Sequence, residues 1–317
     1  MVSAIENGRV QLHFAVFSFN RAEFLVNCLR SLEQCAPHIP VTVFDDNSTD
    51  AATIAVLADI RQRASQNSLL HLVQPSVQSA DPGAGQSKHG GLYHNMQLAL
   101  DSLPDDTLMC TLQDDMQLVR PLTDEDVAAI QAYFAVAPNR AFLHQAFIKA
   151  SELRRSQVEY DAADDTYMLR RARRSAGCFY SDICIAHVGR LRAVRWKFLP
   201  RESLNEKQAH EKFATMAYLA NPFVAWLPSA PAWRGKQRTL ALRLGEKYQR
   251  CGYYPFLSMT DEESLAFCAR ERTVLPVAEQ CLRLDSSVAL KQPWVYHPLQ
   301  GSRWLKWLNS AELKLRR

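Results

Sequence analysis

The sequence has no long apolar run, no paired-cysteine motif and little net charge, and each absence excludes a class of protein. No stretch approaches the roughly 20 apolar residues that cross a bilayer, and Glu6 and Arg9 interrupt the N-terminus before it could act as a secretory signal. The eight cysteines form no CxxC pair and no metal-finger spacing. We therefore expect reduced, mostly buried thiols in a cytoplasmic protein.

The net charge of the chain does not indicate a nucleic-acid partner. A formal charge of +4 over 317 residues is far below the basic excess of a typical nucleic-acid binder. The positive charge is concentrated between residues 140 and 201, where 13 basic residues outnumber 6 acidic ones and leave a charge of +7. This segment would suit an anionic ligand.

Apolar strands alternate with amphipathic helices through the first 135 residues. We expect strands at Gln11–Phe17, Val41–Phe44, Leu69–Val73 and Thr107–Leu112. Helices are expected between residue 22 and Pro37 and at about residues 51–65, 91–103 and 124–135. Such alternation predicts an α/β fold, with a mostly parallel sheet flanked by helices. Ligands of these sheets bind beyond the carboxyl ends of the strands.

Acidic side chains follow two of the predicted strands at the point where each strand ends. Asp45 and Asp46 come after Val41–Phe44, and Asp114 and Asp115 come after the strand that begins at Thr107. Carboxylates gathered at one sheet edge repel one another. A Mn²⁺ or Mg²⁺ ion that bridges them to substrate phosphate removes this repulsion. The alternative is that the acids and hydroxyls of residues 46–50 are turn formers and helix caps.

Four segments in order resemble the N-terminal half of the family-2 type of GT-A glycosyltransferases: AVFSFNRAEFLVNCLRSL, VTVFDDNSTD, GGLYHNMQLALDSL and LMCTLQDDMQLVRP. The resemblance covers about the first 125 residues well and the remainder loosely. It implies a GT-A (Rossmann-like) fold and metal-dependent, inverting transfer of a sugar from a nucleotide diphosphate, which we expect to be a UDP-sugar. The acceptor would be a glycan or lipid-linked glycan in polysaccharide biosynthesis, and the basic segment would suit an anionic one.

The resemblance also divides the chain. Residues 1–125 would form the nucleotide-sugar-binding half of the GT-A domain, and residues 126–238 its acceptor-binding, catalytic half. Residues 239–317 would form a helical C-terminal extension.

Site residues are implied by the same resemblance. Phe17, Ser18 and Arg21 would line the nucleotide pocket, and Asp45 or Asp46 would accept a hydrogen bond from the base. The turn from Lys88 to Gly91, with Asn95, would approach the ribose and the diphosphate. Asp115 would bind the metal, and Asp114 would contact the ribose or serve as a second metal ligand. Gln113 departs from the family pattern, because many relatives carry an acid there.

An inverting transfer needs a base beside the acceptor hydroxyl. The resemblance makes Glu211 the leading candidate and Glu206 the second, in the segment NEKQAHEKFATMAYLANPFVAWLPSA. If neither serves, the base would be one of Asp161, Asp164, Asp165 and Asp182. Lys212 stands where the family often has a second acid, and Trp233 follows where it often has a metal-binding histidine; Trp233 could stack on a sugar.

Three alternatives stay open. Residues 301–317 form a basic amphipathic segment with Trp304 and Trp307, which either lies on the inner face of a membrane or packs on the protein itself. The chain could be a non-catalytic carbohydrate-binding or scaffold protein, as Gln113, Lys212 and Trp233 suggest. A sugar-nucleotide pyrophosphorylase shares the sheet but needs a Gly-rich loop where this sequence has FSFNRAEF.

Overall fold

The first half of the chain forms the strands and helices that its sequence predicts. The computed structural model describes residues 10–74, 91–154, 156–171, 177–233 and 238–315. Its first elements are β1 (Gln11–Ser18), α1 (Ala22–Cys35), β2 (Val41–Asp45), α2 (Ala51–Ala64), β3 (Leu70–Val73), α3 (Leu92–Ser102), β4 (Thr107–Gln113), β5 (Met116–Leu118) and α4 (Asp124–Val136). Each predicted strand and helix is therefore confirmed to within a few residues.

The second half contains shorter elements. They are β6 (Phe142–His144), α5 (Ala150–Leu153), β7 (Ser156–Asp161), β8 (Thr166–Arg171), β9 (Ile185–His187), α6 (Val188–Ala193), α7 (Glu202–Lys212), β10 (Ala217–Leu219) and β11 (Val224–Trp226). The C-terminal part adds α8 (Leu240–Tyr248), α9 (Asp261–Cys268), α10 (Ala278–Cys281) and α11 (Arg303–Leu315).

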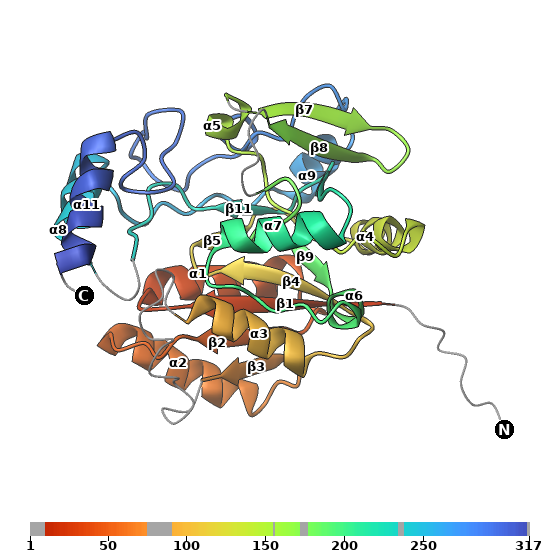
Figure 1. Ribbon diagram of the computed structural model, residues 1–317, viewed down its shortest axis with the longest axis horizontal. Coiled ribbons are helices and arrows are strands. Elements are labelled where there is room, and N and C mark those ends of the chain that lie inside the picture. Colours follow the sequence, from red (N-terminus) through yellow and green to blue (C-terminus); the bar gives the residue numbers. More distant parts are fainter. Residues whose placement is uncertain (1–9, 75–90, 155, 172–176, 234–237, 316–317) are drawn as a thin grey trace.

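One nine-stranded sheet organises the fold, in the order β3-β2-β1-β4-β9-β6-β10-β8-β7. Strands β3, β2, β1 and β4 pair in parallel, and β9 is antiparallel to both of its neighbours. Every strand of this sheet except β8 and β9 runs in the same direction. The predicted α/β class with a mostly parallel, helix-flanked sheet is thus confirmed (Figure 1).

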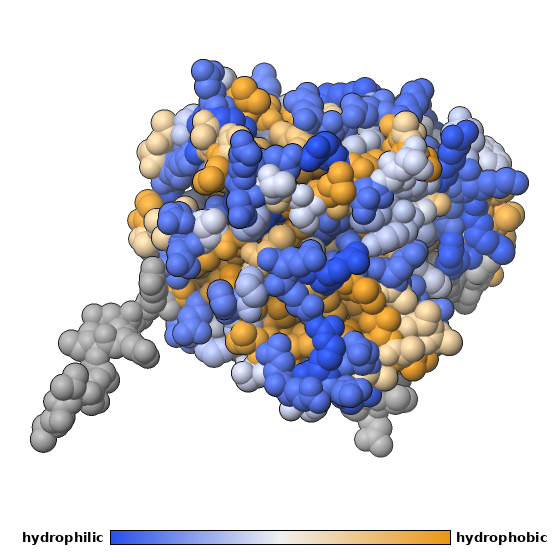
Figure 2. All heavy atoms as spheres, turned by 180° about the vertical axis from the view of Figure 1, so that it is seen from behind, coloured by the Kyte–Doolittle hydropathy of each residue, from blue (hydrophilic) through white to orange (hydrophobic). Residues whose placement is uncertain are grey.

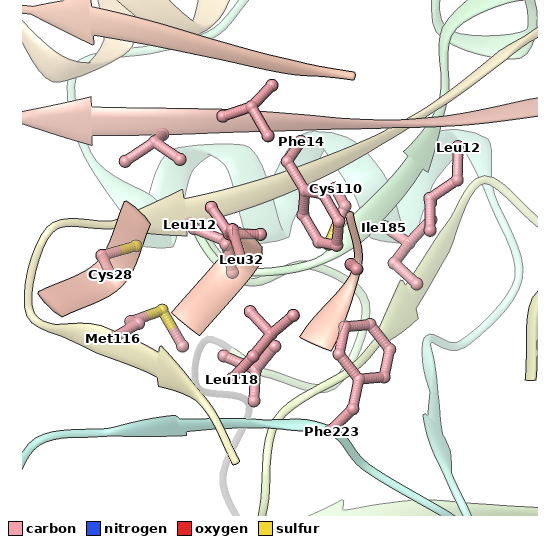
Figure 3. Close-up of a cluster of buried hydrophobic side chains, with 14 of the residues drawn as sticks. Leu12, Phe14, Cys28, Leu32, Cys110, Leu112, Met116, Leu118, Ile185 and Phe223 are labelled. Atoms are coloured by element: carbon pink, nitrogen blue, oxygen red, sulfur yellow. The ribbon is translucent and has the colours of Figure 1, made fainter. Parts of the chain in front are cut away.

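Alternate residues of β1 face two hydrophobic cores on opposite sides of the sheet. Leu12, Phe14 and Val16 pack with residues of α1, α2 and α4, in a core that Figure 3 shows around Cys110 and Leu112 of β4. The residues of opposite parity pack with α3, α6 and α7. Strands covered on both faces read as continuous apolar runs, which is why the sequence pattern identified them.

All eight cysteines lie in the described ranges and are free thiols. Cys28, Cys35, Cys110 and Cys184 are buried and the other four are partly exposed, so the expected burial holds for half of them. None of the described helices is long and apolar enough to span a bilayer. Helices α8 and α11 lie together at one end of the molecule, on the side toward which the β4 arrow points (Figure 1).

Candidate functional site

The carboxyl ends of β2, β1 and β4 lie side by side and gather the predicted site residues. Ser18 pairs with Asp45 in the β1–β2 register, and Phe17 pairs with Gln113 in the β1–β4 register. Ser18 Oγ donates to Asp114 Oδ2 at 3.1 Å, and the backbone N–H of Phe19 donates to the same oxygen at 3.1 Å. The first and last acidic pairs therefore flank a single edge of the sheet.

Arg21, at the start of α1, joins the two aspartates that follow β4. Its Nη1 donates to Asp114 Oδ1 at 3.0 Å and to Asp115 Oδ2 at 2.7 Å, and its Nη2 donates to the Pro231 carbonyl at 2.6 Å. Burial raises the pKa of Asp114 to about 6, although the Arg21 guanidinium acts in the opposite direction. The buried carboxylate of Asp114 thus accepts from three donors, whereas that of Asp115 accepts from one among the residues that the structure describes.

The larger number of donors to Asp114 predicts that its carboxylate contributes more to the stability of the fold than that of Asp115. Asp114→Ala should lower the free energy of unfolding by about 3 kcal/mol, because Ser18 Oγ and the Phe19 N–H lose their acceptor and Arg21 loses one of its two carboxylates. Asp115→Ala should cost clearly less. Urea unfolding followed by circular dichroism measures both variants, and equal losses would contradict the structural role given to Asp114.

Asp115 fits a metal ion that substrate phosphate helps to hold. Its Oδ1 is buried and has no hydrogen-bond partner among the described residues, so one carboxylate oxygen is left for a ligand. Within those residues no group of three or more His, Cys, Asp or Glu side chains forms a metal cluster. Mg²⁺ accepts one or two carboxylates when phosphates and waters complete its shell. This single free carboxylate oxygen suits a cation that binds together with a diphosphate.

The loops after β1 and β2 are tied together by Asn20, which sits in the left-handed region at φ 52°. Asn20 Oδ1 accepts the backbone N–H groups of Thr49 and Asp50 at 2.7 and 2.9 Å. Asp50 caps α2 by accepting Thr53 N at 2.9 Å. The capping role that the sequence left open for Asp50 is confirmed, and the contacts of Asn20 join the capped end of α2 to the loop after β1.

Asp45 and Asp46 have different partners at the end of β2. Asp45 is fully buried, and its carboxylate accepts Ser48 N at 2.9 Å and Ser48 Oγ at 2.5 Å. Asp46 Oδ2 accepts the N–H of Gly91 at 2.7 Å. A Cβ added at Gly91 would lie 2.1 Å from Asp46 Oδ1, so only glycine permits this approach.

Asn95 carries a buried amide on the same side of the sheet. It lies on α3 one turn beyond Gly91, is 1% exposed, and neither its Oδ1 nor its Nδ2 has a hydrogen-bond partner among the residues that the structure describes. An unsatisfied buried amide costs about 1–3 kcal/mol. A polar ligand entering between α3 and the strand ends would recover part of that cost.

A second polar cluster lies beside these strand ends. Thr111 Oγ1 of β4 donates to the carbonyl oxygen of Asp182 at 2.9 Å, which holds Asp182 beside the carboxyl-terminal part of β4. Tyr93 Oη donates to Asp182 Oδ2 at 2.8 Å, while Asp182 Oδ1 is buried and has no hydrogen-bond partner within the described ranges. Burial and the neighbouring carboxylate of Glu202 raise the pKa of Asp182 to about 8.

Lys149 faces the same cluster. Its Nζ lies 3.3 Å from the centre of the Trp226 ring and 4.8 Å from that of Tyr296. Burial lowers the pKa of Lys149, against the opposing charges of Glu152, Asp115 and Glu202. A cation held between aromatic rings near Asp115 and Glu202 offers positive charge to an anionic group at the site.

The raised pKa of Asp182 makes stability depend on pH. Between its ordinary pKa near 4 and about 8, the folded state holds a proton that the unfolded chain has released, so stability falls as pH rises through this window. We expect the free energy of unfolding of the wild-type chain to fall by about 1–3 kcal/mol between pH 5 and pH 8 because of Asp182, and Asp182→Asn should remove this fall. Thermal unfolding at the two pH values measures it; identical pH slopes for wild type and variant would contradict the assignment.

The two predicted bases on α7 occupy different environments. Glu206 is buried, and its carboxylate accepts the N–H groups of Cys178, Phe179 and Tyr180 at 2.7–3.2 Å. Glu211 is exposed near the end of the helix. At 1.5 Å per residue it lies about 13 Å along the axis from Glu202, the α7 residue that faces Asp182. The structure does not bring Glu211 to the aspartate cluster.

Phe17 and Trp233 have different surroundings in the structure, and Lys88 is not described by it. Phe17 is only 5% exposed and packs on Phe44, with 5.5 Å between ring centres, so its side chain belongs to the core. Lys88 lies outside the described residues. Trp233 packs edge-on against Phe19 with 5.3 Å between ring centres, beside the backbone that binds Asp114.

Many cations of the basic middle segment serve the fold. Arg140 pairs with Asp164 at 2.6 Å, and Arg192 pairs with Asp105 at 2.6 Å. Arg190 donates to the carbonyls of Phe134, Ala137 and Arg140. The charge excess in the sequence therefore overstates what is free to bind an anionic ligand, and Lys149 is a cation of this segment that lies close to Asp115 and Glu202.

Comparisons with known proteins give distant similarity. No family model matches the chain, and no curated protein matches it in sequence. S. aureus TarS, residues 1–349, aligns at 15% identity and a TM-score of 0.44 over 68% of this chain and 60% of its own. The mannosyltransferase PcManGT from Pyrobaculum calidifontis, solved with GDP-Man and Mn²⁺, aligns at 14% identity and 0.46 over 76% and 61%. The chain thus spans about 60% of these structures.

Proposed function

We propose that this chain is a metal-dependent glycosyltransferase that moves a sugar from a nucleotide diphosphate to a glycan or lipid-linked glycan. The observation that carries the proposal is the edge formed by β2, β1 and β4. There Asp46, Asp114 and Asp115 converge with Arg21 and with a buried Asn95, whose amide has no partner in the part of the chain that the structure describes. Carboxylates, a cation and an unsatisfied amide at one sheet edge suit a ligand with phosphate, ribose and base.

On the donor side, each group would meet the part of the nucleotide that its chemistry fits. Asp46 would accept from the base, Asn95 would bind the ribose or diphosphate, and Asp115 Oδ1 would hold Mn²⁺ or Mg²⁺. A bound divalent cation would neutralise the charge of the departing diphosphate. We infer a UDP-sugar as donor from the sequence resemblance, and Trp233 beside Phe19 could cover its sugar face.

On the acceptor side, Asp182 becomes the first candidate for the base. It lies at the carboxyl end of β4, it has an unpartnered oxygen, and its pKa of about 8 permits proton exchange near neutral pH. Glu206 is occupied by three backbone donors, which suits a positioning residue for the 178–180 loop. Glu211 remains a candidate only if the acceptor reaches the exposed end of α7.

A non-catalytic scaffold is the second candidate function. Gln113 and the engagement of both Asp114 and Asp115 by Arg21 favour it, because the guanidinium already supplies the positive charge that a metal would bring. In that case nucleotide or sugar could bind without turnover.

Calorimetry with UDP, GDP and ADP, each with and without Mn²⁺, tests the proposal. We expect one nucleotide diphosphate to bind more tightly with Mn²⁺, and Asp46→Ala to weaken its metal-free binding by about tenfold, as loss of a charge-assisted hydrogen bond predicts. Asp59→Ala, an exposed change on α2, is the matched control. Absence of binding by all three nucleotides would remove the donor site from the proposal.

A further inference from the structure

Helix α11 has one side packed on the protein and another turned outward. Leu305 and Asn309 are 6% and 7% exposed, whereas Trp304 and Trp307 are 59% and 67% exposed. The sequence offered packing and membrane contact as alternatives for this segment. The structure assigns packing to one face of the helix and leaves the tryptophans on the other.

The inner face is fixed by specific contacts with α8 and the residues around it. Asn309 Oδ1 accepts from Thr239 Oγ1 at 2.7 Å, and Leu305 packs in a small core with Leu242 and Leu299. The Glu312 carboxylate accepts the N–H of Leu240, at the start of α8, at 2.7 and 3.0 Å. Glu312 is the sole acid of α11, so its inward contact leaves the outer face without a negative charge.

The outer face combines apolar and basic side chains. Arg303, Lys306 and Lys314 are exposed there, and Leu315 is 88% exposed. With 3.6 residues per turn, Trp304 and Leu315 fall on one line of the helix, Trp307 lies beside it, and the cations lie next to Trp307. The face therefore has a basic edge and an apolar edge that run the length of the helix.

We propose that α11 docks the protein on the headgroup region of an anionic membrane. Indole rings are favoured at headgroup depth, where the ring is apolar and the N–H meets water. Each Lys or Arg near an anionic surface adds attraction, and no acid on this face opposes it. Thirteen residues at 1.5 Å each span about 20 Å, shorter than the hydrocarbon core, so the helix lies in the interface.

Docking through α11 would hold the candidate site near the lipid surface. In Figure 1 the β4 arrow points toward the end of the molecule where α8 and α11 lie. The chain also connects them: Arg21 binds the Pro231 carbonyl, and Ala232 belongs to the small core beneath Leu305. If α11 docks in this way, the acceptor is a glycan carried on a membrane lipid, an inference that rests on the proposed function.

Vesicle flotation without any donor tests the docking by itself. We expect the wild-type chain to float with vesicles of phosphatidylglycerol and phosphatidylcholine, and to be released by high salt. Trp304→Ser with Trp307→Ser should lower partitioning at least tenfold, and Arg303→Glu with Lys306→Glu should do the same. The control is Leu265→Ser on the acidic helix α9, where the leucine is 71% exposed, and it should bind like wild type.

Because the substituted side chains are exposed, the variants should unfold at the wild-type temperature, which a thermal scan verifies. Failure of the wild-type chain to float with the anionic vesicles would overturn the proposal. Full binding of both α11 double variants to the vesicles would also overturn it. A third contradicting result is a wild-type chain that does not bind vesicles but forms a dimer, which the tryptophan variant abolishes. These outcomes leave the nucleotide-binding test untouched, so the two proposals fail separately.

Discussion

Asp115→Ala should abolish Mn²⁺-dependent binding of the nucleotide donor while the fold remains intact. Asp115 Oδ1 is the carboxylate oxygen of the β4 loop that is buried without a partner, so it is the ligand on which a cation at this edge would depend. With substrate phosphate supplying the remaining ligands, loss of the single protein carboxylate removes the metal contribution. We expect at least a hundredfold loss of affinity in the presence of Mn²⁺, about 2.7 kcal/mol.

Calorimetry with and without Mn²⁺ measures this effect on Asp115→Ala, and Asp59→Ala serves as a surface control. The metal-free affinity should change little, because Asp46 and Asn95 lie on other elements. Unchanged affinity in the presence of Mn²⁺ would remove Asp115 as the metal ligand. A large fall without metal would show that the variant damages the nucleotide pocket itself.

Asp182→Asn should lower the rate of sugar transfer by about 10²–10⁴ and leave donor affinity nearly unchanged. Asparagine keeps the size of the side chain and can still meet Tyr93, but it cannot take the proton of the acceptor hydroxyl. The kinetic measurement is kcat with saturating donor and acceptor, beside a donor titration of the same variant.

Two glutamates of α7 provide the comparison for Asp182. Glu206→Gln should lower activity together with thermal stability, since its carboxylate fixes three backbone N–H groups of the 178–180 loop. Glu211→Gln should transfer at the wild-type rate, because the side chain is exposed away from the cluster. Full activity of Asp182→Asn with loss of activity in Glu211→Gln would return the role of base to Glu211.

The gathering of acidic side chains at the carboxyl ends of β2 and β4 could be predicted from sequence because it depends on local order along the chain. Each acidic pair stands directly after an apolar strand, and parallel neighbours bring those ends to one edge by geometry alone. Asn20, Asp46 and Asp114 therefore lie near one another without help from the rest of the chain. The exact partners, such as Arg21 bridging Asp114 and Asp115, depend on side-chain packing that the pattern does not contain.

The cluster around Asp182 could not be predicted in this way. Asp182 reaches the site because β9, only three residues long, inserts antiparallel between β4 and β6. Such short strands have little periodicity to read. Tyr93, Lys149 and Glu202 come from three further parts of the chain, and only Tyr93 lies in a segment that carries the family resemblance. The available signal was weaker: Asp182 is an acid in the mostly apolar stretch CFYSDICIAHV.

The proposed transfer activity is tested most directly by measuring the release of nucleotide diphosphate from a panel of UDP-, GDP- and ADP-sugars, with and without Mn²⁺. We expect metal-dependent release from one class of donor by the wild-type chain, and loss of that release in Asp115→Ala. If no donor in the panel is turned over with Mn²⁺ while a nucleotide diphosphate still binds, the chain is a scaffold and the proposed transfer activity is contradicted.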